Sequence, residues 1–225
     1  MDIIERPSPN LSDRPTDANI DLVVLHYTGM VSGAAALDRL CDVAAKVSAH
    51  YLIEEDGRAY RLVAENKRAW HAGFSHWAGA FDINDRSIGI EIVNPGHEFG
   101  YRPFPEAQMV TVEVLLADIM NRHGIAPDRV VGHSDIAPSR KQDPGELFDW
   151  QRLAAKGLSV WPADFPPPVS PADAFNRLVA IGYDPAADPT DVVIAFQRRF
   201  VPDNVNGVLD DPTLAMIAAV HAING

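Results

Sequence analysis

Residues 87–94, SIGIEIVN, form the most informative strand that the sequence predicts. Glu91 lies inside this otherwise apolar run, where a carboxylate without a partner is energetically costly. Because side chains alternate along a strand, Glu91 shares a face with Gly89 and Val93, and the glycine leaves room for another group to approach. A buried glutamate with a raised pKa is suited to act as a general base near neutral pH. The alternative is a carboxylate held by an arginine or by backbone donors.

Two further apolar runs each have a histidine at or just after their end. Residues 20–27, IDLVVLHY, are short and β-branched, which favours a buried strand with His26 near its end. Residues 129–132 predict another short strand, and His133 follows it directly. Asp143 stands in the loop beyond. Imidazole and carboxylate groups are zinc ligands, and a catalytic zinc usually keeps three protein ligands and one open position.

The candidate metal ligands are therefore His26, His133 and Asp143, with Zn²⁺ as the cofactor and Glu91 as the base. Each ligand comes from a strand end or from the loop after one, and such ends can converge in a mixed sheet. The ammonium of Lys141 can stabilise negative charge on a polarised carbonyl. The alternatives are a structural role for His26 and a solvated surface loop around His133.

The other elements predict an α/β (α+β) fold, a mixed central sheet flanked by helices. A helix is expected over residues 34–46, a hairpin over 48–63, an amphipathic helix over 105–123 and a closing helix over 148–156. Four residues are secondary candidates for contacts with a substrate: His50, Trp70, His71 and Asn94. For the tryptophan, a place in the core is the alternative.

The chain divides at a proline-rich segment. Residues 1–19 predict an extended lead-in, 20–160 a catalytic domain and 161–171, WPADFPPPVSP, a stiff linker. Residues 172–225 predict a small domain of three helices, over 172–181, 191–200 and 212–222. This domain can bury only a modest core and offers no metal or nucleophile cluster, so binding is its expected role.

Composition limits the function classes. The net charge of −12 over 225 residues argues against a nucleic-acid partner, because phosphates require a basic surface. Cys41 is alone, so no internal disulfide forms, and no run approaches the roughly 18 apolar residues of a transmembrane helix. The polar start lacks a secretory signal, so a cytoplasmic protein is expected, with export by another route as the alternative. A monomer is expected, although the oligomeric state stays open.

Five segments, in order, resemble the type 2 N-acetylmuramoyl-L-alanine amidases, the AmpD/AmiD-like family. They are LHYT at 25–28, SAHYLI at 48–53, AWHAG at 69–73, SIGIE at 87–91, and GHSDIAP at 132–138 with Lys141 and Asp143. The resemblance implies a zinc amidase that cuts the amide between N-acetylmuramic acid, or its 1,6-anhydro form, and L-alanine of the stem peptide. It implies a role in peptidoglycan turnover or recycling, with peptidoglycan or muropeptide fragments as partners.

The resemblance places the metal ligands on His26, His133 and Asp143, the catalytic glutamate on Glu91 and the oxyanion-stabilising lysine on Lys141. One alternative function is a non-catalytic peptidoglycan-recognition protein of the same fold. Another is a metal-dependent deacetylase or peptidase acting on the same polymer.

The tail also resembles a known domain. Residues 192–200, VVIAFQRRF, the turn NGVLD at 206–210 and Thr213-Leu214 are similar to the three-helix peptidoglycan-binding domains. Asn206 stands where that family has an aspartate, so the resemblance implies the fold more firmly than glycan affinity.

Overall fold

The computed structural model describes residues 2 to 224, with the side chain of residue 224 left aside. In this part of the chain, a six-stranded sheet has the order β1-β5-β4-β9-β3-β10. Only the pair of β4 and β5 is antiparallel, so the sheet is mixed, which confirms the predicted fold class. The strands are β1 (Ile3–Glu5), β3 (Leu22–Tyr27), β4 (Tyr51–Ile53), β5 (Ala59–Arg61), β9 (Ser87–Ile92) and β10 (Val130–Gly132).

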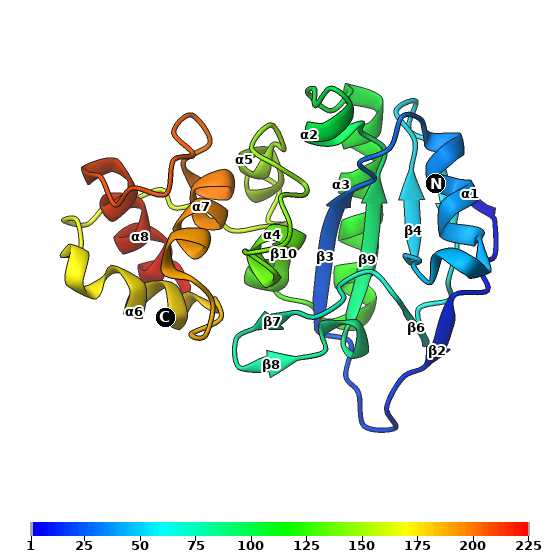
Figure 1. The fold of residues 1–225 in the computed structure, drawn as a ribbon, viewed down its shortest axis with the longest axis horizontal. Coiled ribbons are helices and arrows are strands. Elements are labelled where there is room, and N and C mark those ends of the chain that lie inside the picture. The colour runs from blue at the N-terminus through cyan, green and yellow to red at the C-terminus, as the bar shows by residue number, and fades with distance from the viewer. Residues whose placement is uncertain (1, 225) are drawn as a thin grey trace.

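Alternation along β3 and β9 separates the two faces of the sheet. Val23 and Leu25 of β3, with Ile88 and Ile90 of β9, pack against the long helix α3 (Glu106–His123), which covers one face (Figure 1). The helix begins after Pro105, and Gly124 ends it with a left-handed φ of 67°. His26 and Glu91 have the opposite parity, so they lie on the face away from α3.

The remaining elements surround this sheet. They are α1 (Gly33–Cys41), the antiparallel pair β2 (Leu11–Asp13) and β6 (Lys67–Ala69), the hairpin β7 (His76–Trp77) and β8 (Ala80–Phe81), and the short helices α2 (Gly96–Phe99), α4 (His133–Ile136) and α5 (Trp150–Ala154). The helix predicted over 34–46 ends earlier, because Asp42 is extended and its carboxylate accepts from the Ala44 amide to cap a separate turn.

The N-terminal segment is more ordered than the predicted lead-in. Ile3–Glu5 pairs in parallel with Ala59–Arg61 and so adds an edge strand to the sheet. The half-buried Arg14 guanidinium donates to four backbone carbonyls, those of Glu65, Asn84, Asp85 and Ser87. These bonds attach the segment to the loops before β6 and β9 and to the first residue of β9.

The C-terminal residues form three helices, α6 (Pro171–Ile181), α7 (Pro189–Phe200) and α8 (Asp211–Asn224), close to the ranges expected. They lie beside β10 and α4, at one end of the molecule (Figure 1). Leu22 and Val24 of β3 belong to the same hydrophobic cluster as Leu178 and Phe196. The domain boundary at 161–171 stays a prediction, but the core on the two sides of it is continuous.

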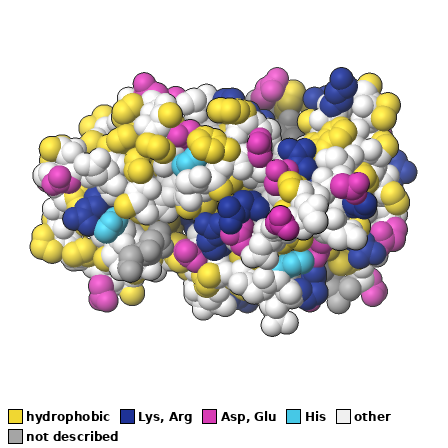
Figure 2. Space-filling view, turned by 90° about the horizontal axis from the view of Figure 1, so that it is seen from below, with side chains coloured by type: hydrophobic (Ala, Val, Ile, Leu, Met, Phe, Trp, Pro, Cys, Tyr) yellow, Lys and Arg dark blue, Asp and Glu magenta, His cyan; other side chains and the backbone are white. Residues whose placement is uncertain are grey.

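The surface agrees with the charge balance. On the face shown in Figure 2, Lys and Arg side chains alternate with acidic and apolar ones and form no continuous basic surface. Among the described residues, no helix has the length and apolar character needed to cross a membrane.

Candidate metal centre

Strand register brings the site together. His26 of β3 lies opposite Glu91 of β9 in the parallel ladder, and Gly132 of β10 lies opposite Leu25. The next residue after Gly132 is His133, the first of α4. Parallel strands end at the same edge of a sheet, so these three side chains meet there. The loop after α4 brings Asp143 back, with the Ser134 amide donating to the Asp143 carbonyl over 2.9 Å.

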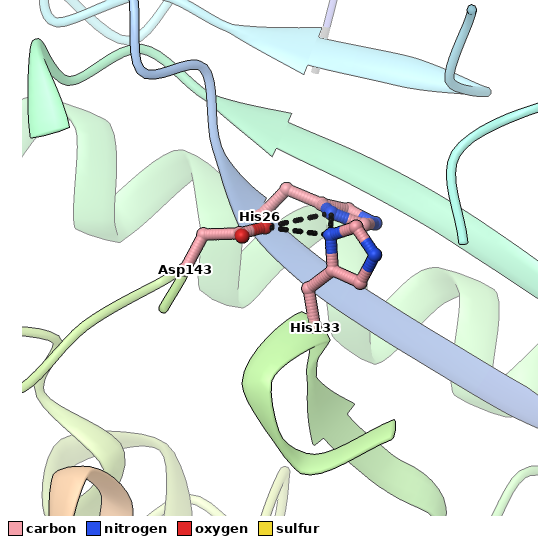
Figure 3. A group of neighbouring side chains, drawn as sticks. All are labelled: His26, His133 and Asp143. Atoms are coloured by element: carbon pink, nitrogen blue, oxygen red, sulfur yellow. Dashed lines mark hydrogen bonds and ion pairs between the residues drawn. The ribbon is translucent and has the colours of Figure 1, made fainter. Parts of the chain in front are cut away.

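The three predicted metal ligands point toward one another (Figure 3). The Nδ1 atoms of His26 and His133 are 2.9 Å apart. Asp143 Oδ2 lies 2.9 Å from the first and 3.0 Å from the second. All three residues are buried. They come from two strand ends and a loop, as the sequence predicted.

Hydrogen bonds on the far side of each imidazole set its orientation. His133 Nε2 donates to the Ala72 carbonyl over 3.1 Å, and His26 Nε2 lies 3.1 Å from His71 Nδ1. With the proton on Nε2, each ring presents the lone pair of Nδ1 to the centre. This is the usual arrangement of histidine ligands, whose outer nitrogen is fixed by a hydrogen bond.

The protonation states suit a cation. Burial and the neighbouring His133 lower the pKa of His26 to about 4, so its ring is neutral near pH 7. Burial alone would raise the pKa of Asp143, but the charge and hydrogen bonds of His133 and His26 hold it well below its ordinary value. A neutral His26 imidazole and an ionised Asp143 carboxylate therefore face each other at this centre.

This donor set fits a metal ion. Three lone-pair-bearing atoms at mutual distances of 2.9–3.0 Å repel one another unless a proton or cation lies between them. Ligand atoms bound tetrahedrally at ~2.0–2.1 Å would lie roughly 3.3 Å apart, close to the triangle seen here. His26, His133 and Asp143 therefore have the donor set and the spacing to hold a metal ion.

Glu91 stands next to this site without a fixed partner. Its Oε2 atom is buried and has no hydrogen-bond partner among the described residues, which argues against the alternative of a carboxylate pinned by an arginine. Burial, and then the charge of Asp143, raises the pKa of Glu91 well above its ordinary value, while Lys141 opposes the shift. An upward shift of the pKa is what a carboxylate needs in order to act as a general base.

The site opens into a cleft of about 370 Å³. Glu91 and Lys141 line it, as do Trp70 and His71, two of the four residues expected to contact a substrate. His71 fits against the sheet because residue 89 is glycine: a Cβ there would lie 2.4 Å from His71 Cγ.

The other two candidates have structural positions. His50 is fully buried behind His71, and its Nδ1 accepts from the Gly89 amide over 2.9 Å. Asn94 is also fully buried, donating to the Arg102 carbonyl and accepting from the Gly96 amide. Neither lines the cleft, and a substrate contact by either stays a prediction.

The sequence analysis missed several residues of the cleft wall, including Tyr27, His97 and Arg140. Tyr27 and Arg140 adjoin predicted site residues in sequence, which was the available signal. No sequence signal pointed to His97, because its position depends on a hydrogen bond of 2.9 Å between its Nδ1 and the Tyr27 hydroxyl, seventy positions away.

The geometry can be compared with known proteins. A model of the family described as N-acetylmuramoyl-L-alanine amidase matches residues 16–146, more than half of the chain. The chain belongs to this amidase family. AmiD of Escherichia coli is 39% identical over 229 residues, covering 89% of this chain and 82% of AmiD. The 1,6-anhydro-N-acetylmuramyl-L-alanine amidase AmpD of Haemophilus influenzae is 37% identical over 163 residues, covering 64% of this chain and 86% of AmpD.

Solved structures of amidases agree with this assignment. AmiD from E. coli, in complex with the substrate anhydro-N-acetylmuramic acid-L-Ala-D-gamma-Glu-L-Lys, superposes with a TM-score of 0.81 at 37% identity, covering 93% of this chain and 92% of AmiD. AmpDh3 from Pseudomonas aeruginosa, in complex with anhydromuramic pentapeptide, gives a TM-score of 0.82 at 34% identity, covering 93% and 94%. The chain is therefore a hydrolase of the amidase class, and its similarity to AmiD extends beyond the residues that the family model matches.

Proposed function

We propose that this amidase is zinc-dependent and hydrolyses the amide between the lactyl group of N-acetylmuramic acid, or of its 1,6-anhydro form, and L-alanine of the stem peptide. The observation that carries the proposal is the triangle of His26, His133 and Asp143, beside Glu91 at an open cleft. The complexes of AmiD and AmpDh3 with anhydro-muropeptides support this class of substrate.

Zinc is the metal that these donors favour. Two imidazole nitrogens and one carboxylate oxygen make a set of borderline ligands that leaves room for a fourth, which is the pattern of catalytic zinc sites. A bound zinc ion polarises the scissile carbonyl and lowers the pKa of water toward about 7.

Glu91 and Lys141 have the two other catalytic roles, proton transfer and stabilisation of negative charge. Glu91 accepts the proton of the attacking water and returns it to the nitrogen of the leaving L-alanine, so that the amine departs neutral. Burial raises the pKa of Glu91, which favours its holding the proton between the two transfers. Lys141, on the wall of the same cleft, supplies a positive charge for the oxygen that becomes negative during attack.

We assign the C-terminal helices a peptidoglycan-binding role. The support is the similarity of residues 192–214 to three-helix peptidoglycan-binding domains. Within these helices, Gln197 on α7 accepts at Oε1 from the amides of Asn206 and Gly207 and donates from Nε2 to the Val208 carbonyl. One buried side chain thereby fixes the turn before α8. It joins the Phe-Gln segment of α7 to the Asn-Gly turn.

The test is digestion of two substrates in parallel, a soluble anhydro-muropeptide and intact sacculi, followed by mass spectrometry. The proposal predicts free stem peptide and a sugar that keeps its N-acetyl group. Loss of acetyl groups, or cleavage within the peptide, would identify a deacetylase or peptidase instead. The relative rates on the two substrates decide between recycling of fragments and turnover of the intact wall.

A further inference from the structure

The turn from β10 into α4, which contains His133, is stabilised by residues that lie outside the sheet. Asp135 is the third residue of α4, and its Oδ2 accepts from the Gly132 amide over 2.8 Å. An acidic side chain at this position satisfies an amide that the start of a helix leaves free. The bond fixes the point at which β10 turns into α4, and His133 is the residue at that point.

The partners of Asp135 come from the C-terminal helices and the loop between them. The Tyr183 hydroxyl donates to Asp135 Oδ1 over 2.8 Å. Arg199 of α7 donates to Asp135 Oδ2 over 2.9 Å, and the two side chains are 4% and 1% exposed. A buried ion pair of this kind holds its geometry closely, because separating the charges would leave one without a partner.

Arg199 also contacts β10 and the loop before the linker. It donates to the Val130 carbonyl over 3.0 Å and to the Ser159 hydroxyl over 3.2 Å, and its guanidinium lies 4.2 Å from the centre of the Trp150 ring. Its position is therefore set by four groups. Because Arg199 is held at several points, it fixes the position of the Asp135 carboxylate and does not move to follow it.

The same turn also locates the carboxylate ligand. The Ser134 amide donates to the Asp143 carbonyl, and the next residue, Pro144, packs against Gly132, where a Cβ would come within 2.8 Å of Pro144 Cδ. A displacement at Gly132 would move both His133 and Asp143.

We propose that Tyr183 and Arg199 are positioning residues for the metal centre, acting through Asp135 on His133 and Asp143. The C-terminal helices then have a second role besides the proposed binding of peptidoglycan: they hold two of the three ligands in place. This inference rests on the proposed function, because it requires that these ligands bind zinc.

The test compares zinc affinity in three variants of the full chain, by competition with a chelator of known affinity. Arg199→Met removes the cation while keeping an unbranched apolar stem, and Tyr183→Phe removes one hydroxyl while keeping the ring. Ile217→Ala is the control: it is fully buried in the same C-terminal core but is on α8 and makes no bond to Asp135. Thermal unfolding of each variant measures general stability.

We expect Arg199→Met to raise the zinc dissociation constant about 10–100-fold, as for other groups that orient a metal ligand, and Tyr183→Phe to raise it less. The control should unfold at a lower temperature with the affinity of the wild type. If Arg199→Met does not fold, Tyr183→Phe decides alone. Wild-type affinity in the folded variants, or an equal loss in the control, would overturn the inference and leave the zinc enzyme intact. A wild-type protein without zinc affinity would overturn both proposals.

Discussion

Replacement of Glu91 by glutamine separates proton transfer from metal binding. Glutamine has nearly the same shape and is placed at the same distance from the ligands, but its amide cannot accept a proton from water. General acid–base catalysis contributes ~10²–10⁴-fold in rate, which corresponds to about 2.7–5.4 kcal/mol of activation free energy. We expect kcat of Glu91→Gln to fall by this factor.

The pH dependence gives a second measure of the same group. Glu91 must be ionised to act as a base, so kcat/KM should decline as pH falls through its pKa. Because burial raises that pKa, the decline should begin above 4.5, the ordinary value for glutamate. The variant should lose this acidic limb from its residual activity.

In the metal-free protein, stability should decrease as pH rises, whereas activity should increase. A carboxylate whose pKa is raised on folding keeps its proton longer in the folded state than in the unfolded state. As pH rises from the unfolded-state pKa of Glu91 to its folded-state pKa, the free energy of unfolding of the wild type should therefore fall by ~1.4 kcal/mol per pH unit, relative to Glu91→Gln. Denaturant titrations of both metal-free proteins at several pH values measure this difference.

The assay is release of stem peptide from a soluble anhydro-muropeptide, with zinc content measured on the same samples. The reasoning requires low activity with zinc retained. Activity within about tenfold of the wild type would remove Glu91 from proton transfer, since the expected minimum is ~10²-fold. Loss of zinc would instead show that Glu91 is needed for the metal site.

Three further substitutions test other parts of the structure. His133→Ala removes one of three ligands, so the purified variant should lose zinc and activity together; full zinc occupancy, measured by elemental analysis, would refute its assignment. Gly89→Ala places a Cβ against the His71 ring and should destabilise the protein by about 1–3 kcal/mol, with activity reduced, while unchanged stability in urea titration would show that His71 moves freely. Leu178→Ala should lower the free energy of unfolding by about 2–5 kcal/mol. Because the core is continuous, calorimetry should still show one unfolding transition. Two resolved transitions would show independent domains.

The sequence predicted the central sheet and the convergence of His26, His133 and Asp143 because short-range rules place these side chains at strand ends or in the loops after them. Alternation along β3 and β9 is enough to place His26 and Glu91 on one face, and strand ends are where polar side chains can meet. The boundaries of α3 followed from Pro105 and Gly124 in the same way.

Long-range contacts determine what the sequence missed. Ile3–Glu5 becomes a strand only because Ala59–Arg61 offers an open edge, and a three-residue strand carries no pattern of its own. The three prolines of the predicted linker carry no information about the packing of α6 and α7 against the sheet. The ion pair of Arg199 with Asp135 joins residues 64 positions apart, so its existence appears only in the folded chain.

X-ray diffraction at the zinc absorption edge, from crystals grown with zinc, addresses the metal centre most directly. The account predicts a single strong anomalous peak ~2.0–2.2 Å from Nδ1 of His26, Nδ1 of His133 and a carboxylate oxygen of Asp143, with its fourth position open to the cleft. A peak bound by other side chains, or no peak between these three, would contradict it.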